Sequence, residues 1–192
     1  MDWTKEESKS AFIKEVEKIN NDTLRNRCLE IVEEIPSYFW EVPASSSGKY
    51  HPECDLGSGG LVRHSLMVTK CGLDLLTAEI FGRDDENARD MVRVSCLFHD
   101  SFKSGKVNSD GTYSKHTVFE HPKFAAEFLD RTLPKDTYGR EQIISAVYSH
   151  MGKWNVNKYG NSEPLPKPQS RFEKLVHTAD YMASRKYIKW LE

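Results

Sequence analysis

The chain has 192 residues, a length that fits one compact domain or at most two. Its 27 Lys and Arg residues nearly balance 29 Asp and Glu residues, and the formal net charge of −2 argues against a nucleic-acid or membrane surface built on bulk charge. No apolar run approaches the roughly 18 residues of a membrane span. The opening MDWTKEESKS resembles no secretory signal, so we expect a cytoplasmic protein with no membrane partner.

Apolar residues recur with a period near 3.6, and alternation with period 2 never persists, which predicts an all-α fold. Helices are expected over 4–19, 22–35, 60–81, 86–100, 122–131, 139–150 and 170–190. Asn20, Asn21 and Asp22 divide the first two helices. We therefore expect residues 1–192 to form a single helical bundle, in which 1–40 is an N-terminal helical pair.

Three long connections interrupt the predicted helices, over 41–59, 101–120 and 152–169. Loops of this length in a compact domain are commonly functional, and the first two adjoin histidine-bearing helices. The connections carry four aromatic residues against which a nucleobase could stack, with ordinary packing as the alternative: Tyr50, Phe102, Tyr113 and Trp154.

The first candidate functional residue is His64, in the helix that begins at Gly60. It shares one apolar stripe with Leu61 and Val68, which predicts that its ring points inward. A single inward histidine is most often a hydrogen-bonded core residue. Arg63 projects about 100° away on the same helix, so we expect it at the surface or an interface and not in catalysis.

A second inward histidine has a carboxylate beside it. In VSCLFHD, His99 shares a face with Met91 and Ser95, and Asp100 follows. A buried Asp without a cation is costly, and imidazole nitrogen together with carboxylate oxygen suits a divalent metal. A solvated pair at a helix end is the alternative. Asp180, in KLVHTADYMASRKY, borders the apolar stripe of the last helix and is a further candidate for the same site.

In order and spacing, these residues resemble the H…HD…D ligand pattern of the HD-domain metal-dependent phosphohydrolases. The resemblance covers about residues 48–188 and rests on the blocks GGLVRHSLMV, HDSFK, EHPKFAAEFL and VHTADYMASR. It implies a helical HD-domain core over 48–188. It also implies that four of the residues above are metal ligands: His64, His99, Asp100 and Asp180.

Two further histidines match positions that hold a second metal in some HD-domain families. His121 lies in the HP block, and His150 ends the next predicted helix. The alternatives are a helix-cap residue for His121 and a packing residue for His150. The resemblance implies that Asp100 bridges two ions, with His64, His99 and Asp180 completing one site and His121 and His150 the other. The predicted ligands are nitrogen and oxygen donors without thiolate, which favours manganese, iron, cobalt, nickel or magnesium, although zinc also fits.

Two divalent ions can bind phosphoryl oxygens and activate water, so the predicted function is hydrolysis of a phosphoester in a nucleotide or similar small substrate. Asp100 and Lys103 are the predicted catalytic residues. Lys103 matches the cation of the family's HDIGK run and would stabilise charge on the phosphoryl group, although Phe102 replaces the family's glycine. The run SHMGKWNVNKYG holds only Lys153 and Lys158, which argues against a long nucleic acid as substrate.

Three alternative functions stay open at this point. The chain could be a phosphodiesterase or nuclease acting on an oligonucleotide or cyclic nucleotide, a non-catalytic module that senses nucleotides, or a purely structural helical domain.

Three histidines lie outside the predicted site. His177, one turn before Asp180, is expected to support a ligand. His116 is expected to face solvent, and His51 to be an ordinary polar loop residue.

Overall fold

The computed structural model describes residues 1–78, 80–157, 160 and 163–187, which form seven α-helices and no strand. The helices are α1 (Lys5–Val16), α2 (Asp22–Ile31), α3 (Gly60–Thr77), α4 (Glu86–Phe98), α5 (His121–Thr132), α6 (Arg140–Ser149) and α7 (Arg171–Ala183). Short 3-10 helices occupy the connections: η1 (Val32–Glu34), η2 (Ser37–Trp40), η3 (Glu53–Asp55) and η4 (Gly152–Trp154). The all-α prediction is confirmed.

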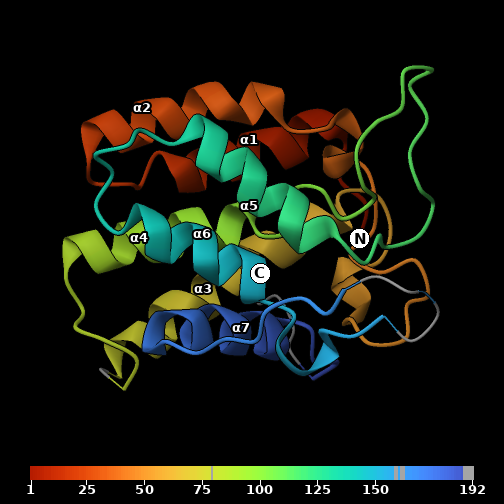
Figure 1. Ribbon diagram of the computed structural model, residues 1–192. Helices are drawn as coiled ribbons and strands as arrows, with labels where there is room; N and C mark the ends of the chain where they lie inside the picture. The colour runs from red at the N-terminus through yellow and green to blue at the C-terminus, as the bar shows by residue number, and fades with distance from the viewer. Residues whose placement is uncertain (79, 158–159, 161–162, 188–192) are drawn as a thin grey trace.

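The helices pack as a bundle. Helix α3 packs against α4 and α7, and α6 packs against α4, α5 and α7. Figure 1 shows α1 and α2 side by side on one face of the bundle and α3 and α7 on the opposite face. The loops over 41–59 and 101–120 gather at one end, on the right of Figure 1.

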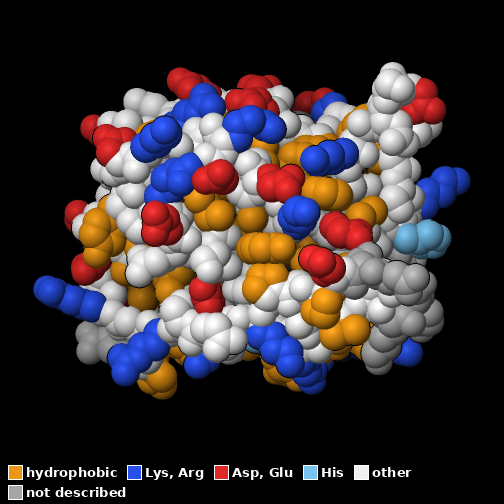
Figure 2. All heavy atoms as spheres, viewed as in Figure 1, with side chains coloured by type: hydrophobic (Ala, Val, Ile, Leu, Met, Phe, Trp, Pro, Cys, Tyr) orange, Lys and Arg blue, Asp and Glu red, His pale blue; other side chains and the backbone are white. Residues whose placement is uncertain are grey.

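The surface agrees with the near-neutral charge of the sequence. On the face drawn in Figure 2, acidic and basic side chains are interspersed, and neither sign forms a continuous patch. Among the described helices, none has the length and apolar character needed to cross a membrane.

The predicted N-terminal pair shares a core with the other helices. Phe12 of α1 packs edge-on against Phe98, the last residue of α4, with ring centroids 5.3 Å apart. The buried carboxylate of Asp90, also in α4, accepts hydrogen bonds from the backbone N–H groups of Asn20 and Asn21 at 2.8 and 2.9 Å. The turn between α1 and α2 is therefore fixed to α4, the helix that leads into the His99-Asp100 pair.

Apart from α4, four helices end at least three residues earlier than the apolar period predicts. The first is α1, which is predicted to residue 19 and ends at Val16. Helix α2, predicted to residue 35, ends at Ile31 and continues as η1; α3, predicted to 81, ends at Thr77; α7, predicted to 190, ends at Ala183, and 188–190 lie outside the described residues. Thr77, Ala78 and Ile80 are exposed, Ile80 by 68%. Burial of an apolar face therefore no longer stabilises the helix there.

The early end of α4 shapes the site. The helix stops at Phe98 and not at residue 100, because the chain enters a tight turn in which the N–H of Ser101 donates to Phe98 O at 3.2 Å and that of Lys103 to Asp100 O at 3.0 Å. On a continuing helix, His99 and Asp100 would project about 100° apart. In the turn, both side chains face the same buried cluster.

Candidate metal centre

The six predicted metal ligands converge from five helices and the turns beside them. His64 lies in α3, Asp180 in α7 and His121 at the start of α5, while His99 and Asp100 follow α4 and His150 follows α6. All but Asp180 are at most 1% exposed, and the Asp180 side chain is 23% exposed. Their ligand atoms form three groups whose members lie within 4.8 Å of one another: His64, His99 and Asp100; His99, His150 and Asp180; Asp100, His121 and His150.

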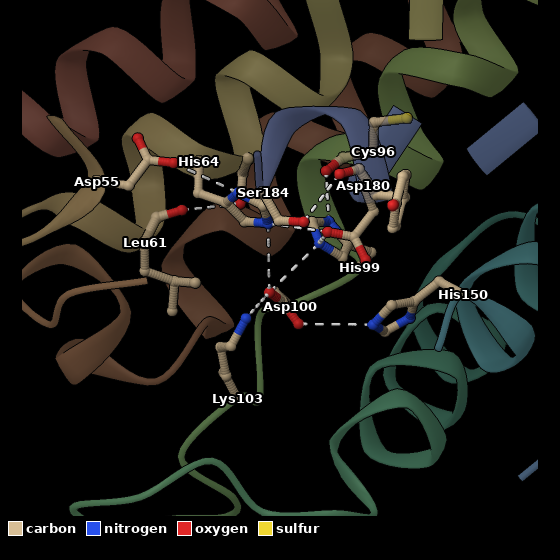
Figure 3. Close-up of polar contacts among 12 residues, drawn as sticks. Asp55, Leu61, His64, Cys96, His99, Asp100, Lys103, His150, Asp180 and Ser184 are labelled. Carbon is tan, nitrogen blue, oxygen red and sulfur yellow. Dashed lines mark hydrogen bonds and ion pairs between the residues drawn. The ribbon is translucent and has the colours of Figure 1, made fainter. Parts of the chain in front are cut away.

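Asp100 is the centre of this cluster (Figure 3). Its Oδ1 lies 3.0 Å from His121 Nε2 and 3.6 Å from His150 Nε2. Its Oδ2 lies 3.3 Å from His99 Nε2 and 3.9 Å from His64 Nε2. The two oxygens of one carboxylate thus face different pairs of histidines, an arrangement that allows one carboxylate to contact two cations.

Backbone hydrogen bonds orient three of the rings. The Nδ1 atoms of these histidines lie 2.7–2.8 Å from carbonyl oxygens three residues earlier: His99 to Cys96, His121 to Val118 and His150 to Val147. Because a carbonyl only accepts, each Nδ1 carries the hydrogen and Nε2 of the neutral ring carries a lone pair. Each helix end therefore directs an Nε2 lone pair into the cluster.

The directions of these lone pairs indicate whether the cluster can bind a metal ion. The Nε2 atom of a neutral ring in this tautomer cannot hydrogen-bond to the ionised Asp100, because the nitrogen and the carboxylate oxygens all only accept. Accordingly, the buried His99 Nε2 and Asp100 Oδ1 have no hydrogen-bond partner among the described residues. Leaving such buried groups unpaired costs free energy, and a divalent cation between them would satisfy both kinds of donor. The residues present therefore fit a metal site.

His64 is held differently, between two carboxylates. Its Nε2 lies 3.1 Å from Asp180 Oδ1, and its Nδ1 lies 3.6 Å from Asp55 Oδ2. Burial lowers the pKa of His64, but its interactions with Asp180 and Asp55 outweigh burial and raise the pKa to about 9. Asp55 is fully buried in η3, and sequence reasoning missed it because no periodic pattern marks the inward side of that loop.

Lys103 lies beside Asp100, as the resemblance implied. Its Nζ is 2.5 Å from Asp100 Oδ2, and only 14% of its side chain is exposed. Burial raises the pKa of Asp100, but the ammonium of Lys103 and the adjacent imidazoles of His99 and His121 outweigh burial and hold that pKa well below its usual range. Phe102 turns away and packs against Phe128, with ring centroids 5.3 Å apart, so replacing the family's glycine does not keep Lys103 from the cluster.

His177 and His116 lie where the sequence placed them. The Nδ1–H of His177 donates to the backbone carbonyl of His150 at 2.7 Å, so it supports a predicted ligand without entering the cluster. The ring packs over Gly152, whose φ is +56° and where an added Cβ would lie 2.1 Å from a ring carbon of His177. His116 is exposed.

We expected Arg63 at the surface or at an interface, and the surface position is wrong. Arg63 is fully buried, and its guanidinium donates at 2.6–3.1 Å to the carbonyl oxygens of Met1, Cys54, Leu56 and Ser58. The helical angle alone misleads here, because the chain start and the loop before α3 cover the side of the helix that would otherwise face solvent. Arg63 anchors that loop beside the cluster.

The expectation for His51 is also wrong. Its ring lies edge-on to that of His64, with centroids 4.7 Å apart and an interplanar angle of 75°. Both ring nitrogens are buried and have no hydrogen-bond partner among the described residues. Burial, together with the charges of His64 and Lys103, lowers the pKa of His51 to about 2. A polar loop sequence gives no sign of this burial.

A pocket opens beside Lys103, between the loops over 41–59 and 101–120. Its described lining contains cationic, hydroxyl and aromatic side chains and no carboxylate, and includes Ser46, Lys103, Ser104, Tyr113, Ser114 and Lys115. Tyr113 packs against Tyr38, with ring centroids 4.6 Å apart. This lining suits an anionic or polar molecule, and Lys103 links the pocket to the cluster through its contact with Asp100.

Comparison with known proteins agrees with this geometry. The family model of the HD domain matches residues 61–185, more than half of the chain. A dihydroneopterin 2′,3′-cyclic phosphate phosphodiesterase of Methanocaldococcus jannaschii is 27% identical over an alignment of 191 positions; the alignment covers 91% of this chain and 68% of that protein. No solved structure matches the chain.

Proposed function

This chain belongs to the HD-domain family, and we propose that it hydrolyses a phosphoester of a nucleotide or of a similar small phosphorylated substrate. It is an HD-domain phosphohydrolase with a buried His/Asp cluster. One observation carries the finer proposal: the Asp100 carboxylate and the Nε2 lone pairs of His99, His121 and His150 face one another with no proton to share. Such a cluster needs cations, and cations at this place would hold a phosphoryl group next to Lys103.

The proposed ligand sets follow the two sides of Asp100. His64, His99 and Asp180 would hold one ion on the Oδ2 side, and His121 and His150 a second ion on the Oδ1 side. When bound, divalent ions polarise phosphoryl oxygens and lower the pKa of water, and thereby supply the nucleophile.

The chain's own groups orient and stabilise the reaction. A water oxygen would form a bond to phosphorus while the bond from phosphorus to the leaving oxygen breaks. The proton that the water loses would pass, directly or through solvent, to the leaving oxygen, and negative charge would accumulate on the phosphoryl oxygens. The Lys103 ammonium, 2.5 Å from Asp100, would donate to one of these oxygens. The carbonyls at the helix ends orient three of the imidazoles, and His177 holds the backbone of His150, so little reorganisation is needed.

A cyclic phosphodiester of a nucleotide-like compound is the second candidate substrate. The Methanocaldococcus jannaschii relative is named for a 2′,3′-cyclic phosphate, which favours phosphodiester over monoester cleavage. The pocket beside Lys103 supports a small substrate, because hydroxyl groups and Lys115 line it and Tyr113 offers an aromatic ring for a base.

The test compares metal-stripped protein with protein reloaded with manganese. The substrates are nucleoside 2′,3′-cyclic phosphates, 3′,5′-cyclic phosphates, nucleoside monophosphates and a short oligonucleotide. We expect hydrolysis of a small phosphoester only by the reloaded protein, and none by Asp100→Asn. If the loaded protein binds nucleotides but hydrolyses none of them, the nucleotide-sensing alternative replaces this proposal.

Metal content tests the ligand sets separately. We expect two manganese ions per chain in the wild type and about one in His121→Ala or His150→Ala, because each substitution removes a donor from the Oδ1 side. An unchanged metal content in both variants would make these residues packing histidines.

A further inference from the structure

We propose that His51 contacts the substrate, its ring N–H donating a hydrogen bond to a phosphoryl oxygen held at the metal centre. This inference rests on the proposed function, since it places a phosphoester in the cluster. It adds to the predicted catalytic residues one that no sequence motif indicates.

The position of His51 is the first support. The residue lies in the loop over 41–59, between the exposed Tyr50 and the buried Pro52. Its ring meets that of His64 edge-on, with centroids 4.7 Å apart. Arg63 fixes the carbonyls of the segment that follows, so the loop holds the ring beside the cluster on an anchored support.

The second support is that His51 has no partner within the described chain. Both of its ring nitrogens are buried and make no hydrogen bond there. Buried polar groups are nearly always paired, and an unpaired one costs about 1–3 kcal/mol. The other rings around Asp100 each place Nδ1 on a backbone carbonyl or near a carboxylate. His51 alone offers both nitrogens to a molecule other than the protein.

The charges around His51 indicate what that molecule is. The His51 ring contacts that of His64, and the charges of Lys103, Asp100 and Asp180 also act on it, so His51 lies within the charged surroundings of the cluster. His51 belongs to none of the three groups of donor atoms that could share an ion. A phosphoryl oxygen beside Lys103 is therefore the acceptor that fits, and imidazole has at least one N–H to donate in either protonation state.

The experiment uses the full chain loaded with manganese and inorganic phosphate as the probe. The variants are His51→Ala, His51→Asn and His51→Gln, in which the amide N–H of Asn or Gln takes the place of a ring N–H. Glu53→Ala, an exposed residue of the same loop, is the matched control. Manganese content is measured by elemental analysis, phosphate affinity by calorimetry and folding by thermal unfolding.

We expect every variant to keep the manganese content of the wild type. His51→Ala should raise the dissociation constant for phosphate about tenfold, the change expected for one hydrogen bond. His51→Asn or His51→Gln should recover part of that loss, and Glu53→Ala should not differ from the wild type. On any hydrolysed phosphoester, the same order of variants should hold for kcat/KM.

A loss of manganese in His51→Ala would overturn the proposal, because His51 would then hold or orient a metal ligand. Phosphate affinity equal to that of the wild type, or wild-type protein that binds no phosphate, would also overturn it. If His51→Ala does not fold, the amide variants decide by the same two measurements. Absence of hydrolysis by the wild type would count against the proposed function alone, since the phosphate measurement still decides the role of His51.

Discussion

Replacing Lys103 with methionine removes the positive charge that Asp100 contacts in the metal-free protein. The two groups lie 2.5 Å apart, with side chains 14% and 1% exposed. Removing one partner of a fully buried ion pair costs about 3–5 kcal/mol, because the other charge stays buried without compensation. Lys103 keeps some access to water, and His99 also acts on Asp100, so we expect a loss of about 2–3 kcal/mol.

For a domain of this size, that loss lowers the melting temperature by about 4–12 °C. The loss should be smaller once manganese is bound, because the ion proposed on the Oδ2 side interacts with the same Asp100 oxygen as Lys103. The variant should therefore bind manganese at least as tightly as the wild type. Its kcat should fall about 100-fold if Lys103 stabilises charge on the phosphoryl group, and Lys103→Arg should recover only part of this.

Thermal unfolding in EDTA and in manganese, followed by kinetics on the best substrate, measures these effects. Lys106→Met is the control, since its ion pair with Glu127 is exposed, at 64% and 51%, and should contribute at most about 1 kcal/mol. A melting temperature that falls equally with and without manganese would refute the idea that cations and Lys103 share Asp100. An unchanged kcat with a modest rise in KM would place Lys103 at the rim, where it steers an anionic substrate.

Three further predictions concern groups around the cluster. In metal-free protein, the pKa of His64 is raised to about 9, which adds stability that is fully present below pH 6.5 and is lost as the pH rises toward 9. Urea unfolding across this range should show the fall in the free energy of unfolding. Manganese binds neutral imidazole, so the fall should be smaller in its presence. Arg63→Met leaves loop carbonyls without their donor and should lower the free energy of unfolding by about 3 kcal/mol in urea, so wild-type stability in this variant would contradict the anchoring role. Gly152→Ala should displace the ring of His177 and lower the manganese content. Gly111→Ala is the control, because Gly111 also has a positive φ but has open space around it, and this variant should change only stability. Equal manganese content in both variants would argue against a role of the His177 ring in holding the site.

The sequence by itself determined the helical fold and the side chains most able to bind a metal. Because a helix repeats every 3.6 residues, apolar periodicity placed His64 on the inward face of its helix and Asp180 at the border of the inward face of the last helix. Residue chemistry supplied the rest: buried imidazole and carboxylate side chains with no thiolate suit a divalent metal. These properties are local, so the order of residues along the chain encodes them.

Only the tertiary structure decided which groups meet. It assigned the two oxygens of Asp100 to different histidines, buried Arg63, and brought Asp55 and His51 against His64. The loop that carries these last two residues has no repeating period, so no sequence pattern tells which of its side chains turn inward. Their positions follow from contacts between segments far apart in the chain, made when the loop and the N-terminus close over α3.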